Sequence, residues 1–435
     1  MTPRERRARP MRTAAQRHWA LALAILATLG ALQLLILGAP PPLTELPFGY
    51  GPKIALVAAG EPLGDATRLP AVPYFLGALA ALGCGSTLAF LLKNLILLTP
   101  LAWVLLRVWQ DCPRDWLRAT GLLLLLSFPQ LSRHAFSLVP EEGYLIALVA
   151  LVFFGILRAT PATSSRQLAP YALAIALLPL IKSTMLAAAP VLAIALALKC
   201  RSRAAAALIL VPLVVAVLAL STLHWHNSGR FTPTSSLNGY DFWKANNAYA
   251  LAVFPERTLD EISALAPRVD PGLDEWQWND AMFAAGLGFW REQPRAALDL
   301  LARRVGQVLV RVRGETSPSS FGLRDQLKPI GIGYMVIWRI ALWAALALAL
   351  ACVWRWHRRR GSVRRGELTD ALAFLALIAA LALPWLIGWG SERRLMPMVI
   401  PVALYLLHLH TARSARSRHS ETHKRGADRP DAPAH

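Results

Sequence analysis

Residues 204–223 read AAAALILVPLVVAVLALSTL, a run of twenty residues without a charged side chain. The hydrocarbon core of a bilayer is roughly 30 Å thick, and an α-helix needs about 20 apolar residues to cross it. The other apolar runs occupy residues 18–38, 86–107, 117–136, 143–157, 168–181, 183–198, 331–354, 369–388 and 395–410. We therefore expect an all-α polytopic membrane protein with about ten transmembrane helices.

The composition of the whole chain agrees with this expectation. Of the 435 residues, 55% are apolar and 17% are charged, whereas ordinary soluble domains carry about 25% charged residues. A formal net charge of +20 would also suit a nucleic-acid-binding protein. However, the Arg and Lys residues form short clusters between apolar runs, as in the cytoplasmic loops of membrane proteins. This distribution argues against nucleic acid as a partner.

The basic clusters also predict which loops lie in the cytoplasm. Residues 1–17 form a basic cytoplasmic N-terminus, and residues 18–38 form an uncleaved first span rather than a signal peptide. The other expected cytoplasmic segments are 107–118, 158–167, 199–203, 355–368 and 411–435, the last of them a disordered basic tail. Both termini are then cytoplasmic, and we expect a multi-pass protein of the bacterial inner membrane.

Two outer loops divide the chain into membrane modules and an extramembrane unit. Residues 18–223 form an N-terminal membrane module that includes a first periplasmic loop, 39–70, and residues 331–410 form the C-terminal membrane helices. Between them, residues 224–330 form a periplasmic unit. Within this unit, 280–313 reads as two amphipathic helices broken at Pro294, whereas 237–247 reads as irregular loop.

Three local features complete the expected layout. The apolar stretch 71–84 is too short to span and fits a helix at the membrane interface. Runs 168–181 and 183–198 form a tight helical pair that turns at Lys182. The four cysteines, Cys84, Cys112, Cys200 and Cys352, have no spacing typical of a disulfide or metal site, so we expect free thiols.

Ionisable residues near a bilayer are costly and are therefore candidates for function. In this layout the candidates all fall on the outer side: Glu45, Lys53, Glu61, Asp65, Arg68, Glu141, Glu142, Lys182, Glu392, Arg393 and Arg394. Acidic and basic groups that meet at one membrane face suit a reaction on an anionic lipid carrier. A carboxylate would act as general base, while Arg and Lys would hold a phosphate.

Several motifs along the chain occur in the order typical of one enzyme family. They are Glu45 and Tyr50, KIALVAAGEP, RLPAVPYFLGALAALGCG from Arg68, SLVPEEGYLIALVALVFF with Glu141 and Glu142, LLPLIKSTMLAAAP with Lys182, LNGYDFWKANN, REQPRAALDLLARR, and GWGSERRLMPMVIPVALYLL with Arg393 and Arg394. Over most of its length the chain thus resembles the polyprenyl-phosphate-dependent glycosyltransferases of the GT-C fold. The likeness is to the protein-mannosyltransferase and aminoarabinose-transferase group (glycosyltransferase family 39-like). One departure concerns the family's first-loop Asp, three to four positions before the Tyr, where this chain has Leu46 and Pro47.

The resemblance implies transfer of a sugar, with inversion, from a polyprenyl-phosphate donor to a glycan, lipid or protein acceptor. It implies that Glu45, or alternatively Asp65, takes the acceptor's proton. Arg68, Lys182, Arg393 and Arg394 would bind the donor phosphate, and Glu141 or Glu142 would orient the acceptor or a basic partner. No cofactor is expected and no metal ligand is assigned, although the sequence leaves a need for divalent metal open.

Other interpretations of the same residues stay open. Glu45 fits a solvated loop carboxylate, and Arg68 and Lys182 fit headgroup anchors. His224 and His226 fit an interfacial polar belt better than a metal site. As a whole, the chain could be a transporter or flippase, a lipid-linked oligosaccharide ligase or polymerase, or a non-catalytic assembly protein. A transporter would place charges at mid-membrane depth and show related halves, and no internal repeat is visible.

Overall fold

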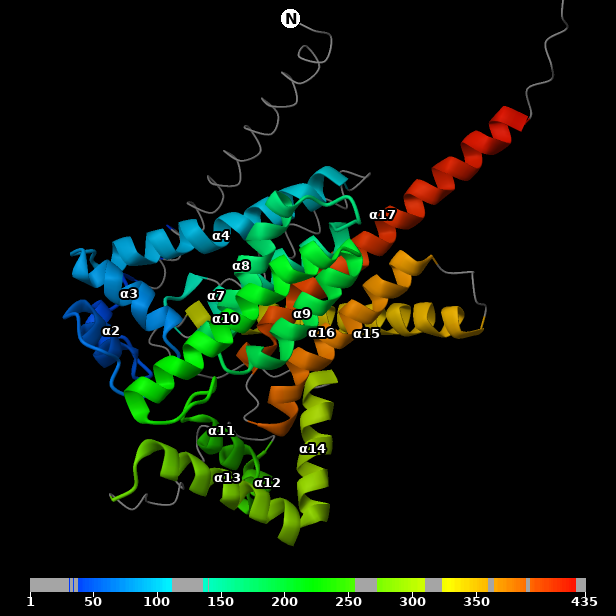
Figure 1. Cartoon of the computed structure of the whole chain (residues 1–435). Helices are drawn as coiled ribbons and strands as arrows, with labels where there is room; N and C mark the ends of the chain where they lie inside the picture. The colour runs from blue at the N-terminus through cyan, green and yellow to red at the C-terminus, as the bar shows by residue number, and fades with distance from the viewer. Residues whose placement is uncertain are drawn as a thin grey trace, which may run out of the picture.

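The computed structural model describes residues 31, 34, 38–111, 136–139, 141–254, 272–309, 323–358, 364–388 and 392–427 (Figure 1). Within these residues the chain forms fourteen α-helices and two 3-10 helices and no strand, which confirms the all-α prediction. The predicted spans 18–38 and 117–136 lie almost entirely outside the described residues, as do the basic residues 1–17.

The apolar runs form the long helices of the molecule. These are α4 (Ser86–Asp111), α7 (Glu142–Arg158), α8 (Ser165–Ile181), α9 (Met185–Cys200), α10 (Arg203–Ser228), α15 (Leu323–Arg358), α16 (Arg365–Ile387) and α17 (Met396–Ala427). Among the described residues, four segments are long and apolar enough to cross a membrane by length and composition: Ser86–Val108, Arg203–Ser228, Met335–Arg358 and Arg365–Ile387. Shorter apolar helices include Ser165–Ile181 and Met185–Cys200, the tight pair predicted around Lys182.

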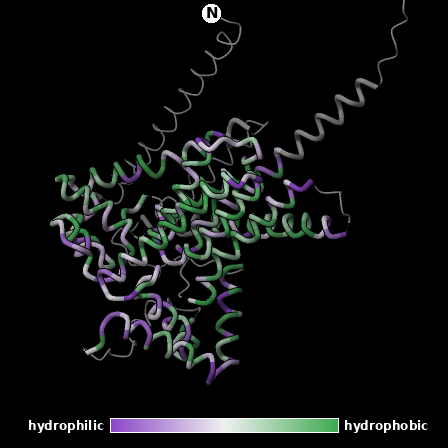
Figure 2. The backbone as a smooth tube through the Cα atoms, viewed as in Figure 1, coloured by the Kyte–Doolittle hydropathy of each residue, from purple (hydrophilic) through white to green (hydrophobic). Residues whose placement is uncertain are grey.

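Helix α7 forms the centre of the helical body. It is apolar on all sides, and every residue from Glu142 to Leu157 is buried, because such a helix needs neighbours around its whole circumference. It packs against α4, α8, α9 and α17. In contrast, α10 leaves Val211, Val214, Val215 and Leu218 at least half exposed. An exposed apolar stripe of this kind suits contact with lipid, and Figure 2 shows hydrophobic residues concentrated in the helical body.

The second outer loop folds into a helical unit at one end of this body, below it in Figure 1. The unit consists of α11 (Asn238–Ala245), α12 (Ala248–Val253), α13 (Glu275–Glu292) and α14 (Pro294–Leu309). Its own core includes Trp243, Met282, Phe289 and Leu300. The predicted pair of helices broken at Pro294 is confirmed by α13 and α14.

The prediction of an irregular loop at 237–247 is wrong, because α11 occupies most of this segment. Residues such as Asn238 and Gly239 have low helix propensity, but tertiary packing overrides this preference. Trp243 and Ala245 are buried, and a Cβ added to Gly239 would lie 2.0 Å from the Asn279 carbonyl oxygen. The glycine therefore allows α11 to approach α13 closely.

The first outer loop contains η1 (Leu43–Glu45), α2 (Tyr50–Ala58) and α3 (Ala71–Ala81). The eleven residues of α3 are too few to span a bilayer. Hydrogen bonds join this loop to the second outer loop: the Glu275 carboxylate accepts from the Ala66 amide at 3.1 Å and from the Ser236 hydroxyl at 2.7 Å. The two loops that the sequence assigns to the same side therefore contact each other.

The other end of the helical body carries a separate buried polar cluster. Lys199, at the end of α9, lies 2.6 Å from Asp370 near the start of α16, and His408 of α17 lies 3.3 Å from the same carboxylate. These contacts join the end of α9, the start of α16 and the interior of α17.

The structure also bears on the predictions for the C-terminal tail and for the cysteines. The tail expected to be disordered from residue 411 is helical as far as Ala427, since a helix that is already nucleated extends readily when no proline intervenes. Residues 428–435 lie outside the described part. Cys84 and Cys200 are free thiols, as predicted, and Cys352 belongs to no disulfide, while Cys112 lies outside the described residues.

Candidate functional site

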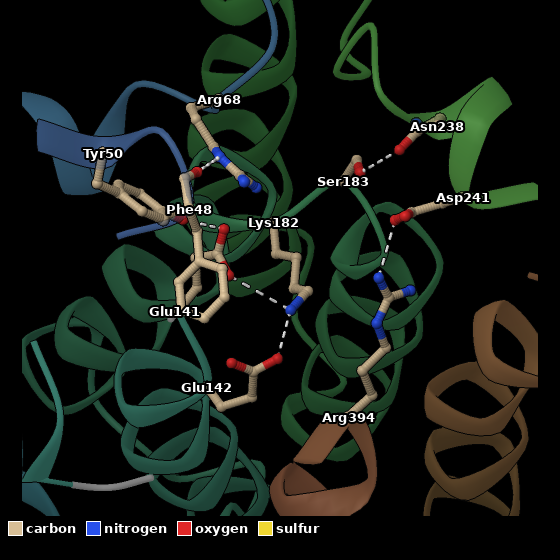
Figure 3. Close-up of polar contacts among 10 residues, drawn as sticks. All are labelled: Phe48, Tyr50, Arg68, Glu141, Glu142, Lys182, Ser183, Asn238, Asp241 and Arg394. Atoms are coloured by element: carbon tan, nitrogen blue, oxygen red, sulfur yellow. Dashed lines mark hydrogen bonds and ion pairs between the residues drawn. The ribbon is translucent and has the colours of Figure 1, made fainter. Parts of the chain in front are cut away.

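Side chains from five separate segments meet where the outer unit contacts the helical body (Figure 3). They are Phe48, Tyr50, Arg68, Glu141, Glu142, Lys182, Ser183, Asn238, Asp241 and Arg394, and we call this set the polar cluster. The contacts form three groups, which the chain connects through neighbouring residues: Phe48, Tyr50 and Arg68 with Glu141, Glu142 and Lys182; Ser183 with Asn238; and Asp241 with Arg394. Of the predicted site residues, Lys182 contacts Glu141 and Glu142, and Tyr50 links Glu141 with Arg68, whereas Arg394 contacts Asp241.

Glu141 lies at the centre of the polar cluster. The Tyr50 hydroxyl donates a hydrogen bond to one carboxylate oxygen of Glu141, and the Lys182 ammonium lies 3.4 Å from the other. Burial raises the pKa of Glu141, but the Lys182 charge, the Tyr50 hydrogen bond and the Arg68 charge together outweigh it and keep that pKa below its usual range. Burial, followed by the charge of Glu141, raises the pKa of Tyr50 well above its usual range. An ionised carboxylate is therefore held by a neutral phenol.

The Lys182 ammonium contacts two carboxylates. Besides Glu141, its ammonium contacts the buried Glu142 carboxylate at 2.5 Å. The linker between α8 and α9 places it there, because Lys182 leaves the helix in an extended conformation and turns its side chain toward the start of α7. Two carboxylates thus offset a single ammonium charge.

Arg68 forms one edge of the cluster. Its Nε donates to the Phe48 carbonyl at 2.8 Å, and its guanidinium lies 5.1 Å from the centroid of the Tyr50 ring. No described residue accepts a hydrogen bond from its two terminal nitrogens. These nitrogens form the pair of parallel donors that binds carboxylates and phosphates best.

Helix α11 covers the other edge. Asn238, in its first turn, is hydrogen-bonded to the Ser183 hydroxyl at 2.9 Å, and Asp241, one turn later, accepts from Arg394 at 2.8 Å. One Asp241 oxygen is held by Arg394, and the side chain is 30% exposed. The Asp241 carboxylate is therefore accessible and held in a fixed orientation.

The remaining predicted site residues lie elsewhere or outside the described part. Glu45, at the end of η1, is exposed, and no described residue contacts its carboxylate. Asp65 forms an ion pair with the buried Lys53 and accepts from the Thr67 amide at 2.9 Å. Burial raises the pKa of Asp65, but these hydrogen bonds outweigh it and lower that pKa. Of Glu392 and Arg393 only the backbone, in η3 (Glu392–Leu395), is described.

Sequence reasoning missed three members of this region. Tyr50 was noted only as part of a motif, and Asp241 stood in a segment read as loop. Lys93 of α4 is fully buried, lies over the Tyr144 ring at 5.3 Å and is hydrogen-bonded to Asn94. A charged residue inside the apolar run 86–107 was the available signal for Lys93. Asp241 had no such signal, because its partner lies 153 residues away.

The described residues contain no group of three or more His, Cys, Asp or Glu side chains that could hold a metal ion. His224 instead contacts the Thr232 carbonyl oxygen at 2.8 Å. No protein-family model, characterised protein or solved structure matches the chain. The geometry and charge of the polar cluster are thus the basis for proposing a function.

Proposed function

We propose that this protein is an integral membrane glycosyltransferase with about ten transmembrane helices. It moves a sugar from a polyprenyl-phosphate donor to an acceptor on the outer, periplasmic face. The supporting observation is the polar cluster itself, in which Arg68, Lys182 and Arg394 meet Glu141, Glu142 and Asp241 at one end of an apolar helical body. A lipid-linked phosphate reaches such a place from the side, with its isoprenoid chain remaining in the bilayer.

The reaction is a single inverting displacement. The acceptor's hydroxyl oxygen forms a bond to the anomeric carbon while the bond from that carbon to the phosphate oxygen breaks. The departing lipid phosphate keeps the electron pair, and the acceptor's proton passes to a carboxylate. Fixed cations beside the leaving oxygen lower the barrier, because negative charge develops there in the transition state.

The contacts divide these roles among the residues. Arg68 and Arg394 hold the donor phosphate, together with Arg393 as the sequence suggests. Lys182 keeps Glu141 ionised and holds both Glu141 and Glu142 in place. Asp241 is the best placed general base, because it is accessible and has one oxygen outside the Arg394 contact, and Glu45 is the alternative. Asp65 has both oxygens occupied by Lys53 and Thr67, so it positions the loop that carries Arg68.

Binding of decaprenyl phosphate to the purified full-length protein in lipid nanodiscs tests the phosphate site. Wild type should bind it about tenfold or more tightly than decaprenol, which lacks the phosphate, because charge-assisted hydrogen bonds contribute that much. Arg68→Ala and Arg394→Ala should lose most of this preference. Arg230→Ala, which removes an exposed cation paired with Asp280 outside the cluster, should keep it. Equal affinity of wild type for both lipids would overturn the proposal.

Surface glycans of cells that express each variant identify the base. Asp241→Asn should abolish the modification that wild type adds, while Asp65→Asn should reduce it only partly. Loss in Glu45→Gln with retention in Asp241→Asn would transfer the role to Glu45. Unchanged glycans in all three variants, with normal membrane insertion, would remove the catalytic hypothesis.

A further inference from the structure

Phe48 has an unusual backbone for its side chain. Its φ is +64°, followed by Gly49 at +78°, and a bulky residue rarely adopts this left-handed region. Burial of the ring does not explain the conformation, because Phe48 is 52% exposed. Such conformations persist where neighbours enforce them, and they are concentrated at ligand sites.

The neighbours that enforce it belong to the polar cluster. Arg68 donates to the Phe48 carbonyl at 2.8 Å and also lies over Tyr50, whose hydroxyl donates to Glu141. In Figure 3 the Phe48 ring points away from Arg68, in the direction of the Glu141 and Lys182 side chains. The exposed Phe48 ring thus belongs to a loop segment that reaches Glu141 through Arg68 and Tyr50.

We propose that Phe48 is a specificity-determining residue whose ring stacks on the sugar of the lipid-linked donor. This inference rests on the proposed function. A pyranose has a face of C–H groups and a rim of hydroxyls, so it needs an apolar surface beneath it and charged acceptors around it. Phe48 would supply the surface and the carboxylates of the polar cluster the acceptors, as in other ligand sites that combine aromatic rings with few polar groups. The isoprenoid chain would need only an apolar contact.

The experiment compares decaprenyl phosphate with decaprenyl phosphomannose and decaprenyl phosphoarabinose, using the full-length protein in nanodiscs. The ratio of the two dissociation constants, without and with the sugar, measures the sugar's contribution. In wild type at least one sugar should tighten binding roughly threefold to tenfold, as an aromatic contact does. Phe48→Tyr and Phe48→Trp keep a ring and should keep this gain.

Phe48→Leu is apolar but has no ring, so it should lose the gain while binding decaprenyl phosphate as wild type does. Phe48→Asn should also lose it, yet its melting temperature should equal or exceed that of wild type, because Asn adopts a positive φ more readily. Phe231→Leu alters an equally exposed aromatic ring outside the cluster and should change neither value.

Three results would overturn the inference while leaving the phosphate site intact. One is a wild type that binds decaprenyl phosphate but gains nothing from either sugar. Another is a full gain in Phe48→Leu, which would show that the ring contacts the isoprenoid or nothing. The third is a lower melting temperature in Phe48→Asn, which would make the ring structural. A different result would overturn the proposed function itself: a wild type that binds decaprenyl phosphate no more tightly than decaprenol.

Discussion

Tyr50 supports the charge of Glu141 through a single hydroxyl. Tyr50→Phe removes this donor and leaves the buried carboxylate with less compensation. Because hydrogen bonds to charged groups contribute about 1.5–3 kcal/mol, the free energy of unfolding should fall by about that amount and glycan transfer should drop. Thermal unfolding in detergent measures the first effect. Tyr249→Phe, at an exposed position of α12, is the control and should leave the melting temperature unchanged.

The pair of Asp65 and Lys53 predicts a pH dependence. The folded protein lowers the Asp65 pKa, mainly by hydrogen bonds from Lys53 and Thr67 that outweigh burial. The carboxylate therefore stabilises the fold above its unfolded pKa of about 3.9 and ceases to do so as the pH falls through the lower folded value. Asp65→Asn should melt below wild type at pH 7, and the difference should shrink below about pH 4. A difference independent of pH would contradict this assignment.

The sequence indicated which single residues carry charge near the membrane, but it did not indicate which of them form ion pairs. Lys182 lacks an acid among its sequence neighbours, so a headgroup anchor explained it nearly as well as a site residue. Its two acids lie 40 and 41 positions away. Packing of α7 against α8 and α9 brings them together, and no local pattern reports that contact.

Among the elements, the cluster of Lys199, Asp370 and His408 joins α9, α16 and α17 at the end opposite the polar cluster. Asp370→Asn would leave the nearly buried Lys199 ammonium without its counterion. Removal of one partner of a buried pair costs about 3–5 kcal/mol, so the variant should melt well below wild type. Asp299→Asn breaks the exposed pair with Arg303 and should cost less than about 1 kcal/mol. An equal fall in melting temperature for both variants would show that the Asp370 cluster stabilises the fold no more than an exposed ion pair does.

The apolar runs predicted the bounds of α7, α8 and α9 closely, whereas α15 begins eight residues before the predicted run 331–354 and α17 continues to Ala427, past the predicted end at 410. The pair α8 and α9 was predicted from two apolar runs that flank Lys182, and α13 and α14 from amphipathic spacing around Pro294. Helix α11 was missed because its sequence favours turns, and only the packing of Trp243 and Gly239 against α13 makes it helical. Because Asp241 lies on this missed helix, it was absent from the predicted site residues.

For the whole molecule, the decisive prediction from the sequence was that the two outer loops share one side with the Glu141 turn, Lys182 and Arg394. The contacts of Glu275 with Ala66 and Ser236, together with the polar cluster, agree with that arrangement. Which compartment this side faces depends on the basic clusters alone and stays a prediction, as does the count of about ten spans. The chemistry of the site depends on the arrangement being right.

Sided labelling of single cysteines in the membrane tests that arrangement most directly. The background lacks the four native cysteines. Glu61→Cys in the first outer loop and Ala284→Cys in α13 are exposed positions on the two outer loops, while Ala162→Cys lies in the loop joining α7 to α8. A membrane-impermeant maleimide added outside intact cells should modify Glu61→Cys and Ala284→Cys, and should reach Ala162→Cys only after the membrane is opened. Labelling of Glu61→Cys and Ala284→Cys from different sides, or of all three from one side, would contradict the account.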